Sequence, residues 1–120
     1  MLENEFNVNN GQLGQGGRTF GRQAYVGPSS NRFGTLTMGR QYDDLADFVS
    51  PLSATAGAFG DAGFAHPYDN DNLQHSVRFN NAIKFTSINY GGSTFGGMYA
   101  FSNSTDLAVS RAYSAGASYT

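Results

Sequence analysis

The sequence SVRFNNAIKFTS at residues 76–87 contains the clearest pattern in the chain. Apolar side chains occupy one set of alternate positions, namely Val77, Phe79, Ile83 and Phe85. Polar side chains occupy the other set, namely Ser76, Arg78, Asn80, Lys84 and Thr86. Because successive side chains of a β-strand point to opposite faces, this alternation predicts a strand with one apolar face and one polar face.

Two later segments repeat the alternation. One apolar face is formed by Phe95, Tyr99 and Phe101, and the next by Tyr113, Ala115, Ala117 and Tyr119. Met98 is an exception, because it lies on the polar side of its segment. Earlier strands are expected at residues 2–8, 19–27 and 33–41, which brings the total to about six. The faces of the strands at 19–27 and 33–41 stay open, because Arg22 falls on the parity of apolar neighbours.

The composition favours strands over helices. The chain has sixteen Gly, seven Tyr and ten Phe, and glycine is costly in helices whereas aromatic residues favour strands. Only 13% of the residues are charged, but the chain is not hydrophobic either, since its mean hydropathy is −0.39. No run approaches the roughly 20 apolar residues that a membrane-spanning helix needs, so a barrel is the only membrane-spanning structure left open.

Several kinds of site are not expected. The absence of Cys excludes disulfides and thiolate metal sites. His66 and His75 have no third ligand near them in sequence, and residues 69–72 lack the Gly and Glu of a calcium-binding EF-hand, so we predict no metal or cofactor. Seven basic residues without a cluster argue against a nucleic-acid partner. We find no nucleophile with a partnered base and predict no enzyme.

The connections alternate in length and differ in charge. Short turns are expected at 28–31 and 89–92, and longer connections at 9–18, 43–75 and 103–110, which is typical of transmembrane barrels. The longest one contains all six acids that lie between Arg40 and Arg78 and not one Lys or Arg. So long a connection is seldom tolerated without a functional reason.

Several stretches together resemble the general diffusion porins of Gram-negative bacteria, nearest their β-proteobacterial branch. They are FNVNNGQ at 6–12, FGRQAYVG at 20–27, GTLTMGRQYD at 34–43, DNDN at 69–72 with SVRFNN at 76–81, and GGMYAFSN at 96–103. The similarity covers essentially the whole chain.

The resemblance implies an all-β, antiparallel transmembrane β-barrel of sixteen strands in the bacterial outer membrane. Such a protein is usually a homotrimer, contacts outer-membrane lipid, and lets ions and small hydrophilic solutes diffuse passively through a water-filled pore. On this resemblance the chain is a partial porin domain that corresponds to strands three to eight. The connection at 43–75 would be the constriction loop, which folds into the barrel.

The resemblance also implies the residues of the pore constriction. Arg40 and Arg78 match basic wall positions, and Lys84 shares the polar parity of Arg78. Asp61 resembles the tip of the constricting loop, and Asp47 is a second candidate for the acid that faces the wall. A Glu often found before that tip is replaced by Ala58.

Two alternatives follow from the residues themselves. About six strands cannot close a barrel, and an open edge in lipid would leave backbone groups unsatisfied. Residues 1–5 also lack the basic and apolar regions of a signal peptide, so we expect a longer reading frame or a non-functional porin remnant. The other alternative is a soluble or surface β-sheet binding module that uses the loop aromatics Phe59, Phe64 and Tyr68.

Overall fold

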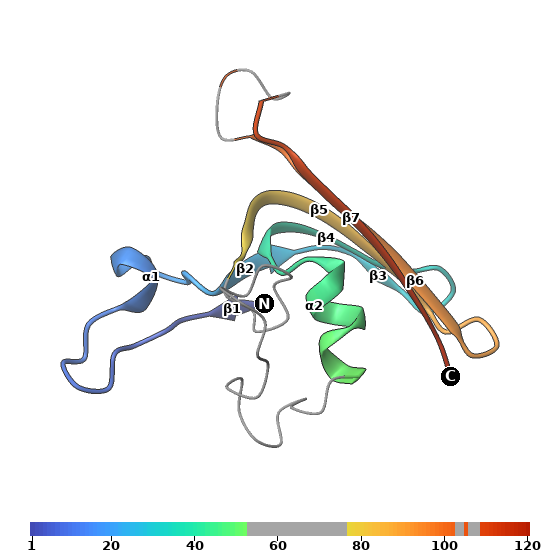
Figure 1. Cartoon of the computed structure of the whole chain (residues 1–120), viewed down its shortest axis with the longest axis horizontal. Helices are drawn as coiled ribbons and strands as arrows, with labels where there is room; N and C mark the ends of the chain where they lie inside the picture. Colours follow the sequence, from blue (N-terminus) through green and yellow to red (C-terminus); the bar gives the residue numbers. More distant parts are fainter. Residues whose placement is uncertain (53–76, 103–104, 106–108) are drawn as a thin grey trace.

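The computed structural model describes residues 1–52, 77–102, 105 and 109–120. They form one curved antiparallel sheet with a short helix on its concave side (Figure 1). The strands are β1 Leu2–Glu3, β2 Gln23–Val26, β3 Ser29–Ser30, β4 Gly34–Gln41, β5 Phe79–Ser87, β6 Ser93–Ala100 and β7 Ala112–Tyr119. The helices are α1 Gly14–Gly17, α2 Asp44–Phe48 and a 3-10 turn at Ser50–Leu52.

The strand order is β1-β2-β4-β5-β6-β7, with β3 paired to β4. Each segment that was predicted to be a strand contributes one to this sheet. The predicted all-β antiparallel fold is therefore confirmed, and within the described residues the sheet is not closed into a barrel. None of the helices in these ranges is long and apolar enough to cross a membrane.

The strand register defines two faces of the sheet. On β6 and β7, Gly96 pairs with Gly116 and Met98 pairs with Ser114, on the side where α2 contacts both strands. We call this the inner face. The outer face exposes large apolar side chains, including Leu36, Met38, Ile83, Phe95 and Tyr113. The predicted alternation of small or polar side chains with apolar ones is confirmed for β6 and β7.

A β-bulge interrupts the alternation at the start of β5. Gly39 of β4 opposes Ala82, whereas Gln41 opposes Phe79, so β5 has one residue more than β4 over this interval. Asn81 adopts a φ of 50°, a left-handed conformation that Asn tolerates better than most residues. The extra residue reverses which face the preceding side chain reaches.

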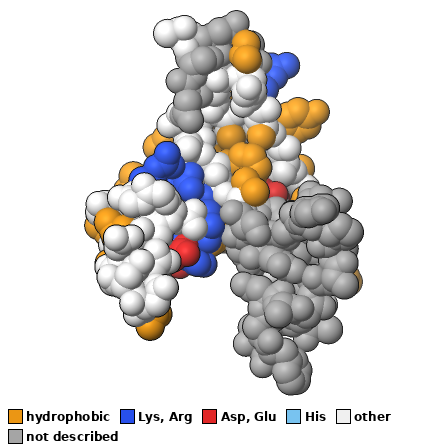
Figure 2. Space-filling model, turned by 60° about the vertical axis from the view of Figure 1, so that its left-hand side comes forward, with side chains coloured by type: hydrophobic (Ala, Val, Ile, Leu, Met, Phe, Trp, Pro, Cys, Tyr) orange, Lys and Arg blue, Asp and Glu red, His pale blue; other side chains and the backbone are white. Residues whose placement is uncertain are grey.

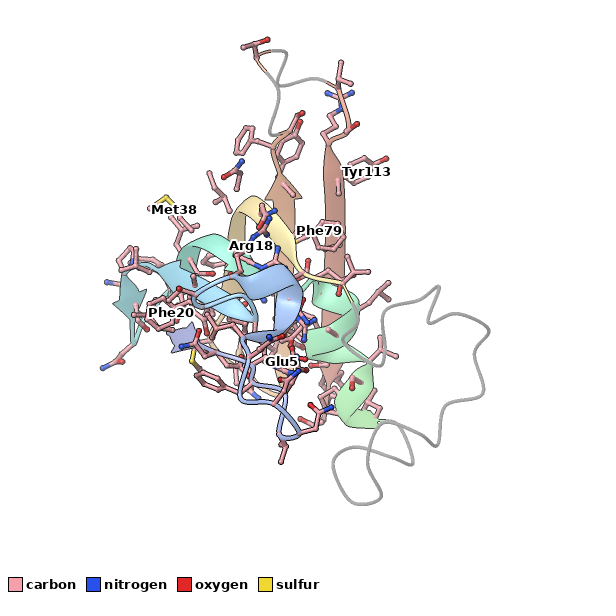
Figure 3. The ribbon with its side chains drawn as sticks, turned by 90° about the vertical axis from the view of Figure 1, so that its left-hand side faces the viewer. Glu5, Arg18, Phe20, Met38, Phe79 and Tyr113 are labelled. Atoms are coloured by element: carbon pink, nitrogen blue, oxygen red, sulfur yellow. The ribbon has the colours of Figure 1, made fainter. Side chains whose placement is uncertain are left out.

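Phe79 consequently lies on the inner face, and the prediction that it shares the face of Ile83 is wrong. It packs against a small inner cluster of Ala82, Met98 and Ala100. Figure 3 shows Phe79 on the side of the sheet where α2 lies and Met38 directed away from it. This cluster also explains Met98, which is buried although its parity is polar.

The two short turns differ in how well the sequence locates them. At residues 89–92, Tyr90 pairs with Ser93, and Gly91 and Gly92 have φ values of 63° and 96°, as a tight two-residue hairpin requires. The turn predicted at 28–31 instead lies at 31–33, because Ser29 and Ser30 extend the sheet by pairing with β4.

The long connection begins with a helix that the sequence pattern did not indicate. The Asp43 carboxylate accepts a hydrogen bond from the Ala46 amide at 3.1 Å and caps the N-terminus of α2. Asp44 and Asp47 lie in the first turn, where negative charge is favourable. Residues 53–75 of the predicted constriction loop, with Asp61, both His, residues 69–72 and the loop aromatics, lie outside the described residues.

Candidate functional site

Tyr42, which directly follows β4, connects two arginines on neighbouring elements. Its hydroxyl accepts hydrogen bonds from Arg22 Nη2 at 3.0 Å and from Arg78 Nε and Nη2 at 3.2 and 3.1 Å. The Arg78 guanidinium also lies over the Tyr42 ring, 5.2 Å from its centroid. One buried phenol thus holds two positive charges near each other, where the chain leaves β4 for α2.

Arg22 is balanced by acids from the N-terminal segment. Its Nε lies 2.8 Å from Glu3 Oε1, and its Nη1 lies 3.8 Å from Glu5 Oε2. These pairs are partly exposed, so each contributes little stability by itself. Their main effect is to fix the guanidinium beside Tyr42.

Lys84 joins the sheet to α2. Its ammonium forms an ion pair with the Asp47 carboxylate and donates to the Tyr42 carbonyl oxygen at 3.0 Å. Because Lys84 lies on β5 and Asp47 on α2, a basic residue of the sheet meets an acid of the long connection. The structure therefore brings together two of the residues that the sequence singled out.

Arg40 has different partners. Its Nε donates to the Gly21 carbonyl at 2.7 Å, and its Nη1 donates to Asn80 Oδ1 at 2.6 Å and to the Arg78 carbonyl at 3.4 Å. Among the described residues, Arg40 makes no ion pair. Its hydrogen bonds tie the start of β2 to the start of β5 and do not reach α2.

Gln41 secures the end of β4 from the inside. Its side chain is fully buried, and its amide oxygen accepts from the Thr37 hydroxyl at 2.6 Å. The amide nitrogen donates to the carbonyls of Ala82 and Thr37 at 3.1 and 3.3 Å. Since a buried amide is costly unless paired, this network fixes where the chain turns towards α2.

Asp44 holds α2 to β7. Its Oδ2 accepts from the Ser114 hydroxyl at 2.8 Å, and its amide donates to the same hydroxyl oxygen at 3.3 Å. The side chain is 1% exposed, and Oδ1 finds no hydrogen-bond partner in the described part of the chain. Burial raises the pKa of the Asp44 carboxyl, although Ser114 and Lys84 oppose the shift.

One face of the molecule carries a band of basic side chains with acidic side chains directly beside it (Figure 2). Such a band presents fixed positive charge to dissolved ions and polar molecules. In the described residues, no cluster of His, Asp and Glu suited to a metal ion is found.

Sequence comparison identifies the kind of protein that carries this sheet. A family model described as Gram-negative porin matches residues 2–120. The chain belongs to the Gram-negative porin family. An outer membrane porin protein of Bordetella pertussis is 36% identical over 102 residues, which cover 85% of this chain and 26% of the relative. The chain thus spans about a quarter of the length of that relative.

Membership of the porin family confirms the resemblance and places the chain in the bacterial outer membrane. Membership of this family suggests a channel-forming protein. The sheet has one apolar face and one face with small or polar side chains. This agrees with the wall of a porin barrel, in which lipid-facing and pore-facing side chains alternate along each strand.

The structure adds two residues to those that the sequence suggested, namely Arg22 and Tyr42. The alternation does not assign Arg22 to a face, because Arg22 shares the parity of the apolar residues Phe20 and Val26. The regular alternation of β2 does not extend back to Phe20, which has a φ of 53°. The Gly39-Arg40-Gln41-Tyr42 motif drew attention to Arg40 and not to Tyr42, whose role depends on partners distant in sequence.

Proposed function

We propose that these 120 residues form part of the wall of a water-filled pore through which ions and small hydrophilic solutes diffuse passively. No bond is made or broken, and selection depends on pore width and on charge along the wall. The observation that carries the proposal is the meeting of Lys84 of β5 with Asp47 of α2 on the inner face. An acid on the long connection against a base on the wall is what a charged constriction requires.

In this proposal Arg78, Lys84 and Arg22 supply positive charge to the wall, and Asp47 supplies negative charge from the connection. The role of Arg78 is supported by its position beside Arg22, since both guanidiniums donate to the Tyr42 hydroxyl. Arg40 belongs to the proposal as a wall residue whose main contacts hold β2 to β5. Asp61 remains a predicted acid of the loop tip.

We extend the same proposal to the assembled protein. Residues 43–75 act as the constriction loop, and residues 1–120 are part of one barrel domain. The outer face contacts outer-membrane lipid, and the assembled protein is a homotrimer without a cofactor or catalytic activity. The exposed apolar side chains of the outer face support the lipid contact.

Planar-bilayer recording on the protein encoded by the complete reading frame tests this function. We expect stepwise currents that grow with salt concentration and persist without any energy source, because the pore is passive. Vesicles that contain an impermeant polymer should swell in isotonic solutions of small sugars, at rates that fall with the size of the sugar. A purified protein that inserts into bilayers but carries no current would contradict the proposal.

A further inference from the structure

Two glycines face each other on the inner side of β6 and β7. Gly96 and Gly116 are register partners, and neither has the positive φ that makes glycine necessary. Glycine within a strand weakens it and often marks the close approach of another group. The reason for glycine here is therefore space.

The space is occupied by Phe48 of α2. A Cβ atom built on Gly116 would lie 2.6 Å from Phe48 Cδ2 and 3.2 Å from its Cγ. A Cβ atom on Gly96 would lie 2.8 Å from the Phe85 carbonyl oxygen of β5, 3.1 Å from Phe48 Cε2 and 3.2 Å from Asp44 Oδ1. The phenyl ring thus rests directly on the backbone of the two strands.

Asp44 and Phe48 form two matched contacts along β7. They lie four residues apart on α2, about 6 Å along a helix axis. Their partners Ser114 and Gly116 lie two residues apart on one strand face, roughly 6.7 Å. Asp44 bonds to Ser114 while Phe48 packs on Gly116, so the helix and the strand match in spacing and direction.

We propose that Phe48 is a positioning residue that sets how far α2 stands from the barrel wall, and hence the free width of the pore. This inference rests on the proposed channel function. Phe48 fixes the distance between α2 and the sheet because its ring contacts the backbone of β6 and β7, and backbone cannot move aside as a side chain can. The Asp44–Ser114 hydrogen bond fixes the position of α2 along β7.

The Gly116→Ala variant tests the inference. Carbon atoms pack best at roughly 3.5–4.0 Å, so a methyl group at 116 must displace the Phe48 ring by about 1 Å. The displacement is directed away from the wall and into the lumen. We therefore expect a loss of single-channel conductance and a lower size limit for polymer exclusion in planar bilayers.

The Gly97→Ala variant is the matched control. Gly97 lies beside Gly96 on the same strand, but a Cβ there would meet only the Ser114 carbonyl, at 3.6 Å. It gains the same methyl group without touching Phe48. Its conductance should equal that of the unmodified protein.

A second variant pair keeps the inference falsifiable if Gly116→Ala assembles poorly. Phe48→Ala removes the ring, so the double variant with Gly116→Ala should recover the conductance that Gly116→Ala alone loses. In the double variant of Phe48→Ala with Gly97→Ala, the effects of the two substitutions on conductance should be additive. Suppose that the unmodified protein conducts. The positioning role of Phe48 is then wrong if Gly116→Ala behaves like Gly97→Ala, or if Phe48→Ala alone leaves conductance and polymer exclusion unchanged. The channel function stands in either case. If the unmodified protein does not conduct, the channel function itself fails.

Discussion

Replacing both Arg22 and Arg78 by Ser is expected to lower the preference of the pore for anions. The two guanidiniums meet at the Tyr42 hydroxyl, so the change removes two neighbouring positive charges from one part of the wall. Fixed charges in a narrow aqueous passage raise the local concentration of counter-ions, and their loss should reduce the anion-to-cation permeability ratio by about twofold or more. Reversal potentials across a salt gradient measure this ratio.

Two control variants separate charge from architecture. Arg32→Ser removes a guanidinium from the turn at 31–33, where it lies over the Phe33 ring, and should leave the ratio almost unchanged. Tyr42→Phe keeps both charges and removes the hydroxyl that holds them, so it should change the ratio less than the double substitution does. Unchanged reversal potentials in the Arg22→Ser and Arg78→Ser double variant would show that these residues do not face the permeating ions.

The Gly34→Ala substitution is expected to have a large effect on assembly. Gly34 has a φ of 123°, and a Cβ there would lie 2.2 Å from the Thr86 carbonyl oxygen and 2.7 Å from Ser87 Cα. Both neighbours are backbone atoms of β5, so the pairing of β4 with β5 must open. Backbone strain of this kind costs about 1–3 kcal/mol before the clash is added. Urea unfolding in detergent micelles should show a clearly lower midpoint.

Gly91→Ala is the comparison that isolates the clash. Gly91 also has a positive φ, 63°, but a Cβ there would meet no atom within 4 Å. It should therefore show only the left-handed conformational cost, roughly 1–2 kcal/mol. Equal stability of the two variants would mean that the close packing of β4 on β5 does not limit assembly.

The strands were predictable from sequence because alternation is a local property. Phe95, Tyr99 and Ser114 lie on the faces that their parity indicates, since β6 and β7 pair without interruption. Phe79 does not, because a bulge depends on the register with β4 and leaves no trace in the alternation. The helix α2 was missed because five residues are too few to show a helical period.

The site was predictable only in part, for a related reason. Lys84 could be found because it shares the polar parity of Arg78, whereas Asp47 is one of six acids in its connection and is a candidate only through the resemblance to porins. The Tyr42 hydroxyl joins residues that are 20 and 36 positions away, and such a meeting is decided by the folded sheet. The pairing of Phe48 with Gly116 is of the same kind.

If the inner face borders water and the outer face borders lipid, the accessibility of single thiols on the two faces should differ, and it can be measured directly. The chain contains no Cys, so single cysteines can be placed at Thr86 on the inner face and Ala115 on the outer face. The two lie at similar depth, because Thr86 pairs with Gly96 and Ala115 pairs with Gly97. With the assembled protein in lipid vesicles, Thr86→Cys should react with a charged, membrane-impermeant thiol reagent, and Ala115→Cys should react only after the lipid is replaced by denaturant. Fast labelling of Ala115→Cys in intact vesicles, with Thr86→Cys protected, would contradict the account.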